Sequence, residues 1–172
     1  GGWDIGRHAE FSGSDLTYFD EEKRDRYVPW VIETSGGVDR AALFFLLDAY
    51  REEDVKGKKR IVLNLHPRLA PYKAAVFPLV ANKPLLVEKA RAIYSDLRNG
   101  VSEKREAAIA WDDRGNIGKR YFSQDEIGTP WCVTVDYQTL EDDTVTVRDR
   151  DTMKQERVAI GELGEYLQRK LS

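Results

Sequence analysis

The sequence predicts an α/β fold in which a mixed β-sheet carries helices on both faces. Three observations support this prediction. From residue 58 onward, short β-rich segments alternate with longer segments whose apolar residues recur at helical spacing. Turns and loops containing proline, glycine or aspartate separate several of these segments. Hydrophobic residues make up 41% of the 172 residues, which is enough to bury a core.

The predicted elements run in order to the end of the chain, and helices between strands place a layer on each face of the sheet. We therefore expect one layered α/β domain over residues 58–172, with a mostly five-stranded sheet. Strands are predicted at 61–65, 73–80, 107–111, 131–136, 143–149 and 154–160, and helices at 84–98, 117–126 and 162–171.

Residues 1–57 show a different and less regular pattern. The β-rich segment 27–33 predicts a strand, and after a glycine-containing turn the apolar spacing predicts a helix over 39–53. The charged stretch 51–60 follows, and Gly57 with its flanking lysines is the best candidate for a linker. Because this region is too short for an ordinary core, we expect it to be the end of a domain that begins upstream.

Charge is distributed unevenly along the chain, whose net charge is −3. The net charge is −6 over residues 1–57, +6 over 58–130 and −3 over 131–172. The middle segment could therefore meet a polyanion such as nucleic acid, whereas the flanks could not. A solvated surface of uneven charge is the alternative explanation.

Several classes of protein are disfavoured. The longest apolar run, 41–47, is far shorter than the ~20 residues of a membrane helix, and the N-terminus has no signal-like apolar region. The single cysteine, Cys132, excludes an internal disulfide, and with only two histidines it leaves little for zinc, so we expect no metal site. Cys132 lies in a predicted strand and is expected to be a buried, inert thiol. A soluble intracellular protein fits best.

The segment 33–40 is the first with candidate functional chemistry. The carboxylate of Glu33 and the hydroxyl of Ser35 follow a predicted strand and could hold an ammonium group. Arg40, in the first turn of the next predicted helix, could hold a phosphate. The alternative is an ordinary strand–turn–helix in which Ser35 is a cap and Arg40 makes a surface ion pair.

The segment 115–131 is the second with candidate functional chemistry. Its predicted helix places cations, an aromatic ring, an amide and carboxylates three to four residues apart, so that they share a face. Such a face could present cations to phosphates, polar groups to base edges and a ring for stacking. An amphipathic helix with internal ion pairs explains the residues equally well.

At these two segments the sequence resembles the C-terminal part of dimeric-type glycyl-tRNA synthetases, which are class II aminoacyl-tRNA synthetases. YVPWVIETSGGVDRAALFFL resembles motif 3 with its preceding strand. LAPYKAAVFPLV, GNIGKRYFSQDEIGTPWCVTVD and TVTVRDRDTMKQERV resemble the anticodon-binding domain. The resemblance covers nearly the whole chain. It implies a three-layer anticodon-binding domain over 58–172, preceded over 1–57 by a strand and motif 3 helix left from an antiparallel catalytic domain.

The resemblance also implies roles for single residues. In this family, the residues at Glu33 and Ser35 help to recognise glycine, Glu33 also belongs to the ATP site, and the catalytic arginine at Arg40 contacts an ATP phosphate. The position of Lys119 contacts the anticodon loop. Because glycine anticodons carry cytosines, a carboxylate could accept a hydrogen bond from cytosine N4. The remaining anticodon candidates on the same helix are extrapolations from Lys119: Arg120, Tyr121, Gln124, Asp125 and Glu126.

The implied function is that of a glycine–tRNA ligase of the cytoplasm, which activates glycine with ATP and Mg²⁺ and transfers it to glycine tRNA. The full enzyme would be a homodimer, with no membrane association. Thr34 stands where the family usually has proline, which leaves Glu33 and Ser35 in place. Motifs 1 and 2 are absent from this sequence, so we expect the chain alone to be inactive and to bind no cofactor. The alternative is a non-catalytic, synthetase-like nucleic-acid-binding subunit of the polymerase accessory type. An interaction domain without a nucleic-acid role, or a synthetase of another specificity, fits the motifs less well.

Overall fold

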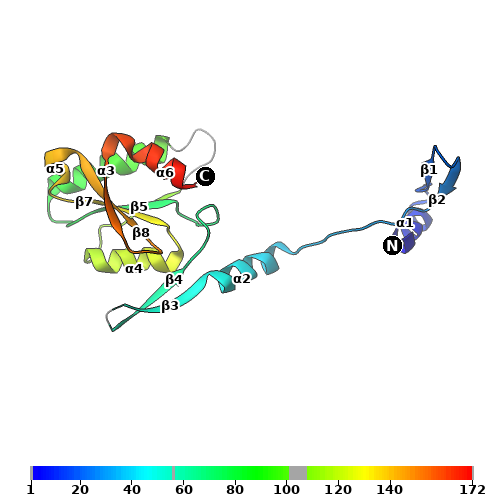
Figure 1. Cartoon of the computed structure of the whole chain (residues 1–172), viewed down its shortest axis with the longest axis horizontal. Helices are drawn as coiled ribbons and strands as arrows, with labels where there is room; N and C mark the ends of the chain where they lie inside the picture. The colour runs from blue at the N-terminus through cyan, green and yellow to red at the C-terminus, as the bar shows by residue number, and fades with distance from the viewer. Residues whose placement is uncertain (1, 56, 101–107, 172) are drawn as a thin grey trace. The chain divides into compact units, whose positions relative to one another are not determined.

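A computed structural model describes residues 2–55, 57–100 and 108–171 (Figure 1). The chain divides into two compact units, Gly1–Ala41 and Ala42–Ser172. The boundary between them lies within a helix, α2 (Val38–Ala49).

The first unit contains a helix, α1 (Gly2–Ser12), and a short antiparallel hairpin of β1 (Tyr18–Asp20) and β2 (Asp25–Tyr27). The strand expected at 27–33 is wrong, because residues 28–37 form no helix or strand. A strand needs a neighbour for its backbone hydrogen bonds, and pairing between β1 and β2 ends at Tyr27.

The second unit is built on a mixed five-stranded sheet, as predicted. Its strand order is β6-β5-β7-β8-β9, with β5 parallel to β6 and β7, and with β7, β8 and β9 successively antiparallel. The strands are β5 (Ala74–Pro78), β6 (Ile109–Trp111), β7 (Trp131–Val135), β8 (Thr144–Asp149) and β9 (Gln155–Ala159).

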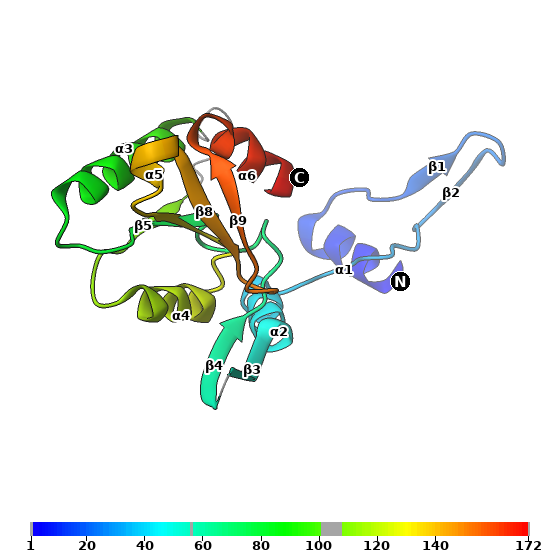
Figure 2. The same ribbon diagram turned by 60° about the vertical axis from the view of Figure 1, so that its left-hand side comes forward.

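Helices cover both faces of this sheet, which confirms the predicted layers. The helices α3 (Pro84–Gly100) and α6 (Leu163–Leu171) bury one face, where valines of β7 and β8 meet leucines of the helices. The helix α4 (Ile117–Ile127) lies on the opposite face, over Ala75, Phe77 and Cys132 (Figures 1 and 2). Short α5 (Thr139–Asp142) and a 3₁₀ turn, η2 (Ile160–Glu162), complete the unit.

The linker expected at Gly57 is instead the turn of a second hairpin, formed by β3 (Tyr50–Val55) and β4 (Lys58–Leu63). The helix before it ends at Ala49 rather than at residue 53. The strand predicted from residue 61 therefore begins at Lys58 and pairs with β3, outside the five-stranded sheet. Charged side chains hide this pairing from a hydrophobicity pattern, because acidic residues of β3 face basic residues of β4, with Glu52 2.9 Å from Lys59.

Candidate nucleic-acid interface

The helix α4 has well-defined ends. Asn116 is its N-cap, and the Asn116 side-chain oxygen accepts a hydrogen bond from the backbone N–H of Lys119 at 2.9 Å. Gly128 ends the helix with φ at 82°, and its N–H bonds to the carbonyls of Asp125 and Gln124. These caps fix where the helix begins and ends.

Only part of the expected binding face is available to a ligand. Lys119 and Glu126 are exposed, and Tyr121 is half-buried. Tyr121 lies edge-on to Phe77, beneath the guanidinium of Arg148, and its hydroxyl is 2.7 Å from the hydroxyl of Thr134. Burial is the main cause that raises the pKa of the Tyr121 phenol, so this group stays protonated at neutral pH.

Arg120, expected to face RNA, instead lies in the interior and bonds to backbone. Its guanidinium donates to the carbonyls of Pro78 at 2.5 Å, Gly115 at 3.0 Å and Arg114 at 3.2 Å. These contacts hold the start of α4 against the end of β5. Its role in the folded chain is therefore structural.

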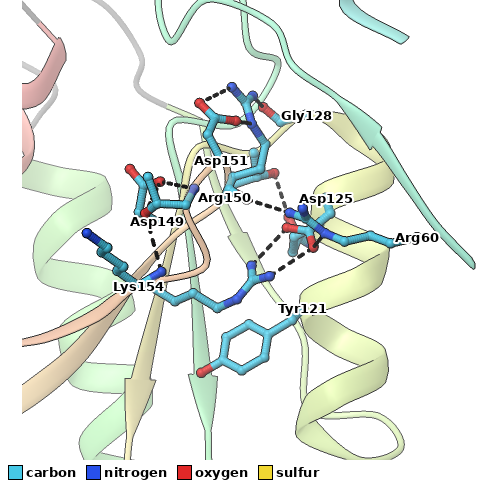
Figure 3. A network of polar contacts seen from close by, with 12 residues as sticks. Arg60, Tyr121, Asp125, Gly128, Asp149, Arg150, Asp151 and Lys154 are labelled. Atoms are coloured by element: carbon cyan, nitrogen blue, oxygen red, sulfur yellow. Dashed lines mark hydrogen bonds and ion pairs between the residues drawn. The ribbon is translucent and has the colours of Figure 1, made fainter. Parts of the chain in front are cut away.

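Asp125 is also buried, with none of its surface exposed. Both carboxylate oxygens accept hydrogen bonds from arginines: Arg60 Nε at 2.8 Å, and Arg148 Nη1 and Nη2 at 2.9 and 3.1 Å (Figure 3). The carboxylate is thus committed within the protein, and the expectation that it reads a cytosine does not suit this geometry. Glu126, the next residue, is the exposed carboxylate of this helix.

Gln124 is largely buried, and its side-chain oxygen accepts a hydrogen bond from the Thr129 hydroxyl at 2.7 Å. The residue lines one edge of a hollow of about 920 Å³ beside the edge strand β6. Aromatic and cationic residues, including Tyr72, Arg98 and Arg114, also line this hollow. Gln124 is therefore placed beside a cavity rather than on the outer face of the helix.

The sequence reasoning missed a polar surface on β8 and β9, next to α4. Alternation along β8 turns its valines into the core and its threonines to the opposite face. There Arg157 of β9 donates to Thr144 at 2.9 Å and forms an ion pair with Asp136 at 2.6 Å. Burial raises the pKa of Asp136, but the bonds from Thr139 and Arg157 outweigh this and leave the pKa lowered. The alternation of TVTVRD could have revealed this surface.

Glu33, Ser35 and Arg40 are all exposed. Among the described contacts, no hydrogen bond or ion pair joins any two of them. Because α2 begins at Val38, Ser35 lies three residues before the helix and does not cap it. In the same unit, Glu33 lines a hollow of about 440 Å³ with residues of α1.

Metal and thiol chemistry find little support in the described ranges. No group of three or more His, Cys, Asp or Glu residues within them could hold a metal ion. His66 accepts a hydrogen bond from the backbone N–H of Arg68 at 3.2 Å. Cys132 is buried, as predicted, and burial raises the pKa of its thiol. No helix in the described part of the chain is both long and apolar enough to span a bilayer.

Residues 73–170, from the first sheet strand to the last helix, match the family described as "Anticodon binding domain". The chain belongs to this family. Within the anticodon binding domain lie α4, with Lys119 and Glu126, and the polar surface of β8 and β9.

Curated relatives extend the similarity beyond the anticodon binding domain. The chain is 51% identical over 170 residues to a glycine–tRNA ligase of Clostridium acetobutylicum, covering 98% of this chain and 35% of the relative. It is 51% identical over 175 residues to the glycine–tRNA ligase of Thermobifida fusca and 53% identical over 170 residues to that of Borreliella afzelii, covering 99% and 97% of this chain and 36% and 37% of the relatives. The chain therefore spans about a third of the length of the relatives it matches.

Proposed function

We propose that this chain is the C-terminal part of a glycine–tRNA ligase and that its anticodon binding domain binds the anticodon loop of glycine tRNA. The observation that carries the proposal is the identity of about half the residues, along nearly the whole chain, with glycine–tRNA ligases. The family of residues 73–170 supports the RNA-binding part. The relatives named above are ligases, which does not favour the polymerase accessory alternative.

In the proposed interface, α4 and the neighbouring polar surface act together. Lys119 offers a flexible cation for a phosphate, and Glu126 offers an exposed carboxylate for cytosine N4. Arg157 and Asp136 present a donor and an acceptor beside Tyr121 on the polar sheet surface. Arg120 and Asp125 hold this surface in shape from within.

The same proposal assigns residues 1–57 to the end of a catalytic domain whose remainder lies in the longer chain. Glu33 and Ser35 would bind the ammonium of glycine, and Arg40 would bind an ATP phosphate and stabilise its charge. A magnesium ion that accompanies ATP would take its ligands from ATP and from the rest of the longer chain, because the described residues gather no carboxylate cluster. We further propose that the complete enzyme is a cytoplasmic homodimer.

Fluorescence anisotropy with this chain tests the RNA-binding part. We expect tighter binding to glycine tRNA than to the same tRNA with altered second and third anticodon bases, across a salt series. Lys119→Ala should remove that preference or, if Lys119 contacts only phosphate, lower the salt slope by about 1 for both tRNAs. Lys83→Ala is the matched control, because Lys83 is exposed in the segment that precedes α3. Equal binding of both tRNAs and duplex DNA by the unsubstituted chain would refute anticodon recognition.

A further inference from the structure

A buried cluster of charge joins the β3–β4 hairpin to the anticodon binding domain. We call Arg60, Asp125, Arg148 and Arg150 the arginine–aspartate network (Figure 3). Asp125 of α4 accepts bonds from Arg60 of β4 and from Arg148 of β8, and Arg60 also donates to the backbone carbonyl of Arg150. The carboxylate of Asp125 thereby holds two arginines that are distant in the sequence, since Arg60 lies 65 positions before it and Arg148 lies 23 positions after it.

Arg150 makes the second half of the connection. Its guanidinium donates to the carbonyl of Gly128, at the end of α4, at 2.7 Å. It also donates to the carbonyl of Leu65 at 2.9 Å and to the side chain of Asn64 at 3.0 Å, both just after β4. The backbones approach closely here, since a Cβ atom on Gly128 would lie 2.9 Å from the carbonyl oxygen of Leu63.

The hairpin is in turn continuous with α2. The helix ends at Ala49 and β3 begins at Tyr50, with no loop between them. The carbonyl of Ala49 accepts a hydrogen bond from the N–H of Asn64 at 2.7 Å, so the end of the helix is tied to the chain just after β4. Arg40 stands in the first turn of this helix.

The charged groups of the arginine–aspartate network are buried and hold one another in a single arrangement. Arg60 is 1% exposed, and the other members are also buried. Burial lowers the pKa of Arg60, but its bonds to Asp125 and Glu53 outweigh this and leave the pKa raised. Well-packed apolar residues often stabilise a protein as well as a buried ion pair does, whereas charged groups with several directional bonds also restrict orientation.

We infer that Arg60 is a positioning residue that couples anticodon binding at α4 to the orientation of α2 and its Arg40. This inference rests on the proposed function and deepens it. RNA bound at α4 contacts the helix that holds Asp125, and Asp125 holds the hairpin from which α2 extends. A correct anticodon thereby favours the placement of α2 that is needed to charge the tRNA.

The test uses the full-length protein that contains this chain, with Arg60→Met as the main variant. This substitution removes the bond from the hairpin to Asp125, but it leaves Asp125 paired with Arg148 and leaves the contacts of Arg150 in place. Lys59→Met is the matched control, since it removes the same charge from the adjacent, exposed position of β4. Arg60→Lys keeps the charge with fewer bonds and serves as the second variant if Arg60→Met fails to fold. Three rates are compared: glycine-dependent ATP–pyrophosphate exchange, glycylation of whole glycine tRNA, and glycylation of an acceptor-stem minihelix without an anticodon.

The coupling predicts a selective loss. For Arg60→Met, kcat with whole tRNA should fall at least about fivefold, with the tRNA KM, pyrophosphate exchange and minihelix charging unchanged. The kcat of Arg60→Lys with whole tRNA should lie between that of Arg60→Met and that of the unsubstituted enzyme. Equal effects of Arg60→Met and Lys59→Met would overturn the inference, and so would a parallel loss of all three activities, which indicates a purely structural role. If the unsubstituted enzyme charges no glycine tRNA, the proposed function itself fails, and the inference with it.

Discussion

The helices α2 and α4 depart in opposite ways from the usual rule that apolar side chains are buried and charged side chains are exposed. Along α2, large apolar side chains are exposed, with Phe44 62% and Leu47 64% accessible. Along α4, Arg120, Gln124 and Asp125 are buried. Exposure of apolar residues and burial of charged ones both require a partner to offset the cost. For α4 the partners lie within the same unit, whereas the described residues leave α2 uncovered.

The difference indicates whether each helix finds its packing partners within this chain. Apolar residues occupy most positions of the α2 sequence VDRAALFFLLDA, which is typical of a helix buried in the core of a larger protein. The relatives are about three times as long as this chain. We propose that, in a full-length protein of that size, the catalytic domain covers α2. The α4 helix instead completes its contacts with β4, β5, β7 and β8. Disrupting each helix should therefore have different consequences for this chain.

The largest effect is expected from Asp125→Ala on α4. The substitution leaves the buried guanidinium of Arg148 without its carboxylate and removes one of the two carboxylates that contact Arg60. Loss of one partner from a buried ion pair costs about 3–5 kcal/mol of unfolding free energy. Urea unfolding of the chain measures this loss. The control is Glu126→Ala at the exposed neighbouring position, which should change the free energy by no more than about 0.5 kcal/mol. Equal results for the two variants would mean that the buried network contributes nothing to stability.

The fate of Asp125 shows why the fold could be predicted more fully than the site. Alternation along 143–149 and helical spacing along 84–98 are local, so the sheet and its covering helices follow from the sequence. Burial of Asp125 depends on Arg60 and Arg148, which no local pattern connects to α4. The position of Asp125 in the helical pattern is the same whether its carboxylate contacts RNA or a buried arginine.

The β3–β4 hairpin was missed for a related reason. Its first strand, YREEDV, has too few apolar residues to predict burial, and pairing with the basic residues of β4 holds it in place. Cross-strand ion pairs of this kind appear only once both strands and their register are known. Conversely, the segment expected as a strand at 27–33 has suitable residues for a sheet, but beyond Tyr27 no strand among the described residues pairs with it.

An intermediate effect is expected at two glycines, one within α4 and one that caps its C-terminus. Gly128 has φ at 82°, and an added Cβ would lie 2.9 Å from the Leu63 carbonyl oxygen, so Gly128→Ala should destabilise the chain by about 1–3 kcal/mol. Gly118 lies within the first turn, with only the Asn116 side chain nearby, at 3.5 Å. Gly118→Ala should therefore stabilise by up to about 1 kcal/mol. Thermal unfolding of both variants distinguishes them, and a loss of stability in both would show that the close contact at β4 is not the cause.

The smallest effect is expected on α2, from Phe44→Ala. Because this ring is mostly exposed, its removal should change the unfolding free energy of this chain by no more than about 0.5 kcal/mol. Phe77→Ala is the matched control: the Phe77 ring is fully buried beneath α4, and its loss should cost about 3–5 kcal/mol. The same Phe44→Ala substitution in the full-length protein sharpens the comparison, because a covered α2 would then lose stability on the scale of Phe77→Ala. A negligible loss there as well would show that α2 remains exposed in the longer chain, and that its apolar residues serve something other than the proposed catalytic domain.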